Sequence, residues 1–357
     1  MKKSFIALCA FILLSTHLMA SPLVTLSGST LSGFSGYKQQ KGQPFRGQFE
    51  NAANVLVGIE LSEQVSAQID MGFGITPNQS GFTDGADLAG LSISIAPQNF
   101  YNTAFTLGSV SVPYGQFSQT DNANIGHYFI YNDLGFSLLR NGSSTTDFGS
   151  NGAMVSTDFS KNGAVDVLVF NGTDDTATNT DQGVGVAFRY TNDALINNVA
   201  FSFSALNVND SGNVNALNAN TTAFMGDVKT AFQGVELGGY VSMITLDDGN
   251  SATKDNVTAY MAYASKRFSK FTLSGRYSVV SPEDFDGNGT GGTSAMPIVG
   301  LGNVPFADVD TTRIQTSAIF HLEDNLNIHN EIIFDTYGEN RTDYNNTAVL
   351  SYASITF

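Results

Sequence analysis

The sequence predicts an all-β protein, a transmembrane antiparallel β-barrel of about 16 strands with short turns at one end and long loops at the other. Many segments alternate apolar and polar residues, which is typical of strands whose two faces meet different surroundings. The connections between these segments alternate between short turns and long polar stretches. After residue 20, no segment approaches 18 unbroken apolar residues, which excludes helical membrane spans.

The segment 325–336 shows the alternation clearly, because apolar and polar side chains fall on opposite faces. The apolar face carries Leu326, Ile328, Ile332 and Phe334. The polar face carries Asn327, His329, Glu331 and Asp335. The same pattern predicts strands at 22–34, 53–62, 65–74, 89–96, 103–112, 151–159, 163–171, 183–191, 196–206, 221–231, 235–245, 256–267, 271–280, 312–322, 325–336 and 346–357. An extra strand within 127–139 is the main alternative.

The predicted strands are joined by two kinds of connection. The short ones are 62–64, 160–162, 269–270 and 323–324. The long ones, rich in Asp, Asn, Gly and Thr, include 77–87, 172–182, 207–220 and 247–256. In membrane barrels, short turns face the periplasm and long loops face the outside. Since the first and last strands run in opposite directions, they can pair and close the barrel.

Residues 1–20 are expected to be a secretory signal peptide, and residues 21–357 a single barrel domain. Lys2 and Lys3 precede a short apolar core, and Ala20 is a plausible cleavage residue. An N-terminal membrane anchor is the alternative, although the apolar core is about half the length of a spanning helix. Cys9 is the only cysteine, so the processed chain would have none and could form no disulfide.

The charge of the chain excludes some partners. Without residues 1–20, 14 basic and 32 acidic residues remain, a formal charge of −18. A nucleic-acid partner would require a basic face, so none is expected. Attraction of cations is the natural consequence of such an acidic chain.

The chain ends in Ala-Val-Leu-Ser-Tyr-Ala-Ser-Ile-Thr-Phe, closing on Phe357. This ending resembles the C-terminal signal of bacterial outer-membrane β-barrels. The resemblance implies an outer-membrane location in a Gram-negative-type cell. It also implies recognition of the last strand by the barrel-assembly machinery.

The segment 113–150 is the longest stretch without alternation and would be the third external loop. Its length of about 38 residues exceeds what a surface connection needs. In strand count, loop order and ending, the sequence resembles general bacterial porins, whose third loop folds into the pore and narrows it. The resemblance implies a homotrimer and a constriction at this loop. Its charged candidates are Asp121, Asp133, Arg140 and Asp147.

Three segments resemble the phosphate-selective porin family. They are Phe105–Gly115, Gly163–Gly172 and Ser274–Tyr277. Phosphate-selective members line the pore with many basic residues. The third loop here has one basic residue, Arg140, against three aspartates, so anion selectivity is not expected.

If the apolar face of each strand meets lipid, the other face lines the pore. The predicted acidic lining residues are Glu60, Asp70, Asp158, Asp166, Asp227, Glu236, Glu331 and Asp335. The predicted basic lining residues are Arg189, Lys229, Arg276 and Arg313. Eight acids against four bases favour cations. Ion pairs within the wall, without effect on flux, are the alternative for any of these residues.

Aromatic residues near strand ends are expected to form girdles at the two membrane interfaces. The candidates are Tyr101, Phe159, Tyr190, Phe268 and Tyr337. Residues 284–289 resemble the first half of a calcium loop but lack the acid at its twelfth position, Ala295, so a flexible acidic loop is favoured.

These patterns predict a porin for passive diffusion of small hydrophilic solutes and ions through a water-filled, weakly cation-preferring pore. Its expected partners are outer-membrane lipid, lipopolysaccharide and two further copies of the chain; no cofactor or metal is expected. The motifs HExxH, GxSxG and GxxxxGK[ST] are missing from the sequence, so no enzyme is expected. The alternatives are a non-conducting structural or receptor barrel and an outer-membrane hydrolase.

Overall fold

The computed structural model describes most of the chain beyond residue 22. The described residues are 23–39, 44–75, 85–97, 100, 102–115, 149–171, 184–196, 198–209, 220–247, 255–283, 295–298, 302–305, 310–338 and 345–357. The expected signal peptide, 1–20, lies outside them. Among these residues, no helix is long and apolar enough to cross a membrane.

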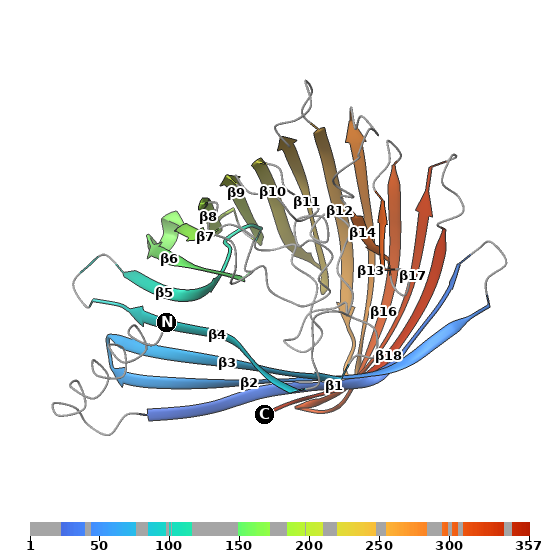
Figure 1. Cartoon of the computed structure of the whole chain (residues 1–357), viewed down its shortest axis with the longest axis horizontal. Helices are drawn as coiled ribbons and strands as arrows, with labels where there is room; N and C mark the ends of the chain where they lie inside the picture. The colour runs from blue at the N-terminus through green and yellow to red at the C-terminus, as the bar shows by residue number, and fades with distance from the viewer. Residues whose placement is uncertain are drawn as a thin grey trace.

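Sixteen antiparallel strands close into one barrel (Figure 1). Each strand pairs with its neighbours along the chain, and β1 pairs with β18 to complete the ring. The barrel strands are β1 (Leu23–Gln39), β2 (Arg46–Ser62), β3 (Val65–Ile75), β4 (Gly85–Ile95), β5 (Thr103–Ser111), β6 (Gly149–Asp158), β7 (Ala164–Asn171), β8 (Val184–Ile196), β9 (Val199–Asn209), β10 (Asn220–Phe232), β11 (Val235–Asp247), β12 (Asp255–Arg267), β13 (Phe271–Glu283), β16 (Thr311–Glu323), β17 (Leu326–Tyr337) and β18 (Asn346–Thr356). Closure leaves no unpaired strand edge, as a wall in lipid requires.

The predicted strand count and order are confirmed, because each of the sixteen predicted segments overlaps one barrel strand. The boundaries were wrong mainly at β1 and β2, which pair as far as Tyr37 and Arg46. The residues there are mostly polar or glycine, so they carry no alternation to mark a strand. A small hairpin of β14 (Ala295–Ile298) and β15 (Gly302–Pro305) was not predicted. The alternative strand at 127–139 lies outside the described residues.

The two faces of the wall differ as alternation predicts. On β16, Ile314 and Phe320 are 46% and 45% exposed. Arg313 and Gln315, the two residues next to Ile314 in the chain, are 0% exposed. Exposed apolar side chains on the outside of a closed barrel are the surface that a bilayer covers. The outer face is therefore the lipid-facing face, and the alternating residues point inward.

Aromatic rings gather on the outer face near the short turns. Phe268 and Phe271 stack with ring centroids 4.6 Å apart, and Phe271 lies 6.4 Å from Phe320. Phe159 and Phe268 are exposed as a girdle requires. The prediction for Tyr337 was wrong: it lies opposite Thr311 on the inner face and is 8% exposed. Tyr101 lies outside the described residues.

The inner face is not polar throughout, which corrects the assumption that apolar side chains meet only lipid. From β7 to β12, inward residues at one height are all apolar and nearly fully buried. This apolar row consists of Leu168, Ala187, Leu206, Ala223, Ile244 and Val257, which lie opposite one another on successive strands. The outer residues of the same strands, such as Phe224 and Met243, are exposed and apolar too. Where both faces of a strand are apolar there is no alternation, so the sequence pattern did not predict the apolar row.

Candidate functional site on the inner wall of the barrel

The four residues that follow β5, Val112–Gly115, leave the wall and lie inside the barrel. All four are buried, and Tyr114 and Gly115 form hydrogen bonds with β8, β9 and β11. We call this segment the loop root, because it begins the long connection between β5 and β6. It shows that this connection starts inward, toward the lumen.

The loop root is held by three hydrogen bonds to three strands. The Tyr114 hydroxyl shares one with the Ser242 hydroxyl at 2.7 Å. The Gly115 amide donates to Ser204 Oγ at 2.9 Å, and the Gly115 carbonyl accepts from Arg189 Nη1 at 3.0 Å. These contacts join residues 74 to 128 positions apart in the chain. The loop root is therefore fixed by the tertiary structure rather than by its own local sequence.

The three wall residues belong to one row of inward positions. Asp166, Arg189, Ser204, Met225 and Ser242 lie opposite one another on β7, β8, β9, β10 and β11. We call this set the anchor row. It lies one inward position from the apolar row, on the side of the short turns. The loop root runs along the anchor row, where polar wall groups meet its backbone.

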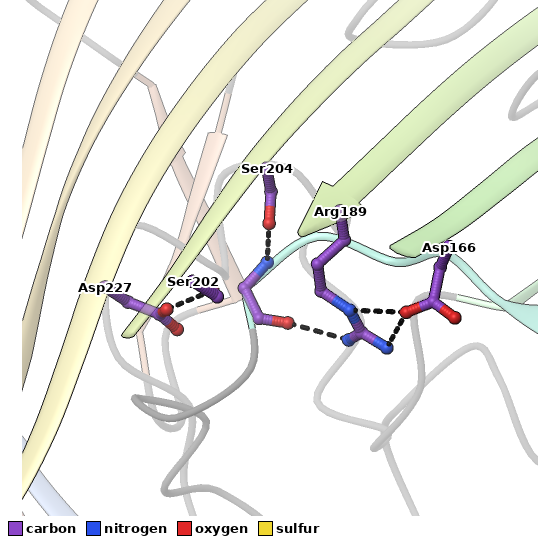
Figure 2. A network of polar contacts seen from close by, with 6 residues as sticks. Asp166, Arg189, Ser202, Ser204 and Asp227 are labelled. Carbon is purple, nitrogen blue, oxygen red and sulfur yellow. Dashed lines mark hydrogen bonds and ion pairs between the residues drawn. The ribbon is translucent and has the colours of Figure 1, made fainter. Parts of the chain in front are cut away.

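Arg189 makes the charged contacts of the anchor row, as Figure 2 shows. Its Nε and Nη2 both donate to Asp166 Oδ2, at 3.0 and 2.8 Å, while its Nη1 donates to the Gly115 carbonyl. The Arg189 and Asp166 side chains are 20% and 13% exposed. A planar guanidinium with several donors suits this double role, because one edge can hold a carboxylate while the other holds a carbonyl.

Apolar packing supports the loop root beside these bonds. Val110, Val112 and Tyr114 are 6%, 5% and 2% exposed and belong to the same buried cluster as the apolar row. Burial raises the pKa of the Tyr114 hydroxyl, so it stays protonated at physiological pH. The base of the long connection is thus seated on a continuous apolar surface with polar contacts at one edge.

A second polar network lies on β13, β16 and β17. Arg313 and Asp335 form a two-bond ion pair, with Nε–Oδ1 at 2.6 Å and Nη2–Oδ2 at 3.0 Å, and both side chains have 0% exposure. Arg276 Nε donates to Gln315 Oε1 at 2.7 Å, and Gln315 Nε2 donates to Glu331 Oε1 at 2.7 Å. These predicted lining residues do face inward, but they are buried and paired within the wall.

The remaining predicted pairs on the inner face are smaller. Ser202 donates a hydrogen bond to Asp227, which Figure 2 also shows. Lys229 Nζ lies 3.8 Å from Glu236 Oε2, and this pair is partly exposed. The Tyr263 hydroxyl also donates to Glu236, at 2.8 Å. Arg189, Lys229 and Arg313 therefore each have an acidic partner on the neighbouring strand.

The inner wall of β2 and β3 is more open. Glu60 is exposed, and Asp70 is part-exposed and accepts a 2.6 Å hydrogen bond from Asn54 Nδ2. Gln68, between them on the same inner face, is exposed. Acidic and neutral polar groups are thus accessible on the inner face of β2 and β3, whereas most inner side chains from β7 to β13 are buried.

Other predicted site residues have different positions. Asp158 lies at the end of β6, where its carboxylate accepts the Ser160 amide at 2.7 Å and stabilises the short turn. Asp121, Asp133, Arg140 and Asp147 lie outside the described residues. So do residues 284–289. Within the described part of the chain, no group of three or more His, Cys, Asp and Glu side chains is placed to hold a metal ion.

One Ser–His pair bears on the hydrolase alternative. His329 Nε2 lies 2.9 Å from Ser354 Oγ, but both residues are buried, at 2% and 1% exposure. Serine hydrolysis requires a histidine oriented by a third polar group. His329 Nδ1 has no hydrogen-bond partner among the described residues, and a substrate could not reach Ser354. The pair therefore has the geometry of a structural contact.

Sequence reasoning identified Arg189 and Asp166 but missed Tyr114, Gly115, Ser204 and Ser242. The available signal was weak: Val112 is followed by Pro113-Tyr114-Gly115 directly after a strand, and proline and glycine mark turns and loops. The serines alternate in β9 and β11 like many others in the chain. Only their place in the anchor row distinguishes them.

The comparisons with known proteins agree with this architecture. No protein-family model matches the chain, and no curated protein matches it. Among solved structures, the anion-selective porin from Comamonas acidovorans is 12% identical over 94% of this chain and 100% of its own, with a TM-score of 0.65. The outer membrane channel DcaP of Acinetobacter baumannii is 9% identical over 94% and 97%, with a TM-score of 0.64. OmpT of Vibrio cholerae, solved in a trimer form, is 11% identical over 95% and 100%, with a TM-score of 0.62. At these identities the likeness establishes the fold, a 16-strand antiparallel barrel of the outer-membrane porin type.

Proposed function

We propose that this outer-membrane β-barrel is a porin, through which small hydrophilic solutes and ions diffuse passively. The observation that carries the proposal is the loop root, which enters a closed sixteen-strand barrel and is fixed to its inner wall. A loop that starts inside the lumen narrows the pore without closing it. The structural similarity to a porin and to an outer membrane channel supports the same function.

We further propose a weak cation preference. The predicted lining residues include eight acids and four bases, and Arg189, Lys229 and Arg313 are each paired with an acid. The accessible groups on β2 and β3 include Glu60 and Asp70. An acidic surface in a narrow, low-dielectric passage attracts cations.

Planar-bilayer recording tests both proposals. Purified, folded protein under a KCl gradient should give large conductance steps and a reversal potential that favours cations. A reversal potential that favours anions would contradict the proposed cation preference but not the proposed porin function. Folded protein without conductance would instead support a structural or receptor barrel, the alternative that the buried inner wall of β7–β13 favours.

A homotrimer belongs to the same proposal. Two polar pairs lie on the lipid-facing side of adjacent strands: Ser32 with Asn51 at 2.5 Å, and Ser351 with Asn330 at 2.9 Å. Polar groups are costly against hydrocarbon, so contact with another copy of the chain is more favourable at this face than contact with lipid. The trimer form of the Vibrio cholerae neighbour supports it. Native mass spectrometry should show three copies, and a monomer would contradict this part.

Two further partners complete the proposal. The last strand closes the barrel by pairing with β1, and two backbone hydrogen bonds between Gly28 and Phe357, at 2.9 and 3.0 Å, extend this pairing to the last residue. We place recognition by the barrel-assembly machinery at this strand. Outer-membrane lipid would cover the apolar wall, and lipopolysaccharide would contact its long-loop end.

A further inference from the structure

We propose that Arg189 is the positioning residue of the loop root, where the long connection between β5 and β6 begins, and that Asp166 orients Arg189. The inference rests on the proposed porin function only for its consequence, the width of the passage. Its structural basis is the set of contacts that Arg189 makes in the anchor row. Sequence patterning had placed Arg189 among the charges that line the pore, which is a different role.

The first step of the argument is geometric. Arg189 is the side chain that links a charged group of the wall to the backbone of the loop root, through Asp166 Oδ2 on one side and the Gly115 carbonyl on the other. Charge-assisted hydrogen bonds are stronger than neutral ones. The hydrogen bond from Arg189 to the loop root is charge-assisted, whereas Ser204 and Ser242 contribute neutral hydroxyls.

The second step concerns Asp166. With Asp166 in place, two of the three guanidinium nitrogens are engaged on one carboxylate oxygen, which leaves Nη1 directed at Gly115. The two residues lie directly opposite each other on β7 and β8. Without the carboxylate, a long arginine side chain would regain rotamer freedom and its charge would be uncompensated. Asp166 thus acts on the loop through Arg189.

The third step is the location of the contact. Gly115 ends the loop root, and its φ of +72° is in the left-handed region. The Gly115 amide and carbonyl are both bonded to the wall, so the Arg189 bond restrains the backbone orientation of this residue. The apolar cluster holds the loop root by burial, which is not directional.

Three variants separate positioning from charge. Arg189→Lys keeps the charge but cannot hold a carboxylate and a carbonyl with one planar group. Arg189→Gln leaves Asp166 uncompensated, and Asp166→Asn leaves Arg189 uncompensated. Ser202→Ala is the matched control, because Ser202 is the next inward residue on the strand that bears Ser204, and its hydrogen bond is to Asp227.

The first readout is hydrogen–deuterium exchange of the peptide containing 112–115, measured on the folded barrel in detergent. Loss of one charge-assisted bond should raise exchange of the Gly115 amide roughly tenfold in Arg189→Gln and several-fold in Arg189→Lys and Asp166→Asn. Ser202→Ala should stay at the wild-type rate. Hydrogen–deuterium exchange can be measured without conductance. A wild-type barrel that passes no current would therefore overturn the proposed porin function but not this proposal.

The second readout is single-channel recording. Open-channel current noise should rise in all three variants, because the loop moves more in each. The reversal potential should move toward cations in Arg189→Gln, away from cations in Asp166→Asn, and not at all in Arg189→Lys. Shifts of reversal potential without a rise in exchange would reduce Arg189 to a lining charge and overturn the proposal. An equal rise in Ser202→Ala would overturn it too, because it would show general loosening of the wall.

Discussion

At the scale of single residues, the loop root depends on a glycine that no other residue replaces without strain. Gly115 has φ +72°, a conformation in which a Cβ atom approaches the following carbonyl oxygen. Its amide and carbonyl are both bonded, to Ser204 and Arg189. The residue therefore cannot relax to a common backbone conformation without losing these contacts.

We expect Gly115→Ala to destabilise the loop root by about 1 kcal/mol, since alanine must adopt a left-handed conformation there. Exchange of the 112–115 peptide should rise, and single-channel noise with it. Gly226→Ala is the matched control: a Cβ added at Gly226 meets nothing within 4 Å. Equal behaviour of the two variants would show that the conformation of Gly115 does not matter.

Two ion pairs on the inner face offer a comparison of buried and exposed charge. Arg313 and Asp335 are fully buried, whereas the Lys229 and Glu236 side chains are 39% and 27% exposed and lie 3.8 Å apart. Removing one partner of a buried pair leaves an uncompensated charge. An exposed pair is screened by water and contributes little.

Asp335→Asn should therefore lower the free energy of unfolding by about 3 kcal/mol, and Glu236→Gln by less than about 1 kcal/mol. Urea titration of the barrel, followed by the shift between folded and unfolded bands on a gel, measures both. Joint replacement of Arg313 and Asp335 by apolar residues should recover part of the loss. A small effect of Asp335→Asn would mean that water reaches the pair.

At the scale of elements, the long connection between β5 and β6 joins wall and lumen. Its root is fixed by β8, β9 and β11, so the rest of the loop starts from a defined position. Asp121, Asp133 and Asp147 of this connection are candidates for the pore constriction, so conductance measurements can test their role. Arg140 is its one basic residue between 113 and 150.

Neutralising the three aspartates together, as Asp121→Asn, Asp133→Asn and Asp147→Asn, should lower the cation preference, because rings of acid favour cations in a narrow pore. The reversal potential under a KCl gradient is the measurement. An unchanged reversal potential in the triple variant would remove the loop from the selectivity argument. A control triple of Asp247, Asp248 and Asp255 near another loop should have the smaller effect.

Strand prediction succeeded where each face of an element had one character. On β16 and β17, apolar outer residues alternate with polar inner ones, and both strands were found almost to their ends. On β1 and β2, the pairing beyond Phe34 and Phe49 is between polar and glycine residues, so the strands were predicted too short. Backbone pairing with a neighbour extends a strand past the point where its side chains show a pattern.

At the scale of the whole molecule, the closed barrel carries an excess of acid. The chain has 32 acidic and 16 basic residues, and the named inner-face residues share that imbalance. The field of such a wall acts through water in the lumen, where salt screens it. The selectivity of the pore should therefore depend on ionic strength.

We expect the cation preference to fall as KCl rises from 0.1 M to 1 M, because the screening length shrinks from about 10 Å to about 3 Å. The ratio of cation to anion permeability, from reversal potentials at a fixed gradient, checks this. Selectivity that does not change with salt would indicate discrimination by direct contact at a narrow site. The Arg189→Lys variant is a suitable control, since it keeps the total charge.

By itself, the sequence determined the number, order and pairing direction of the barrel strands, since alternation and turn length are local properties that can be recognised along the chain. The tertiary structure alone decided which inward residues meet. The apolar row, the Arg313–Asp335 pair and the seat of the loop root depend on the register of neighbouring strands and on contacts across as many as 128 positions. Closure of the ring places β5 and β11 on one lumen, and no local pattern contains that information.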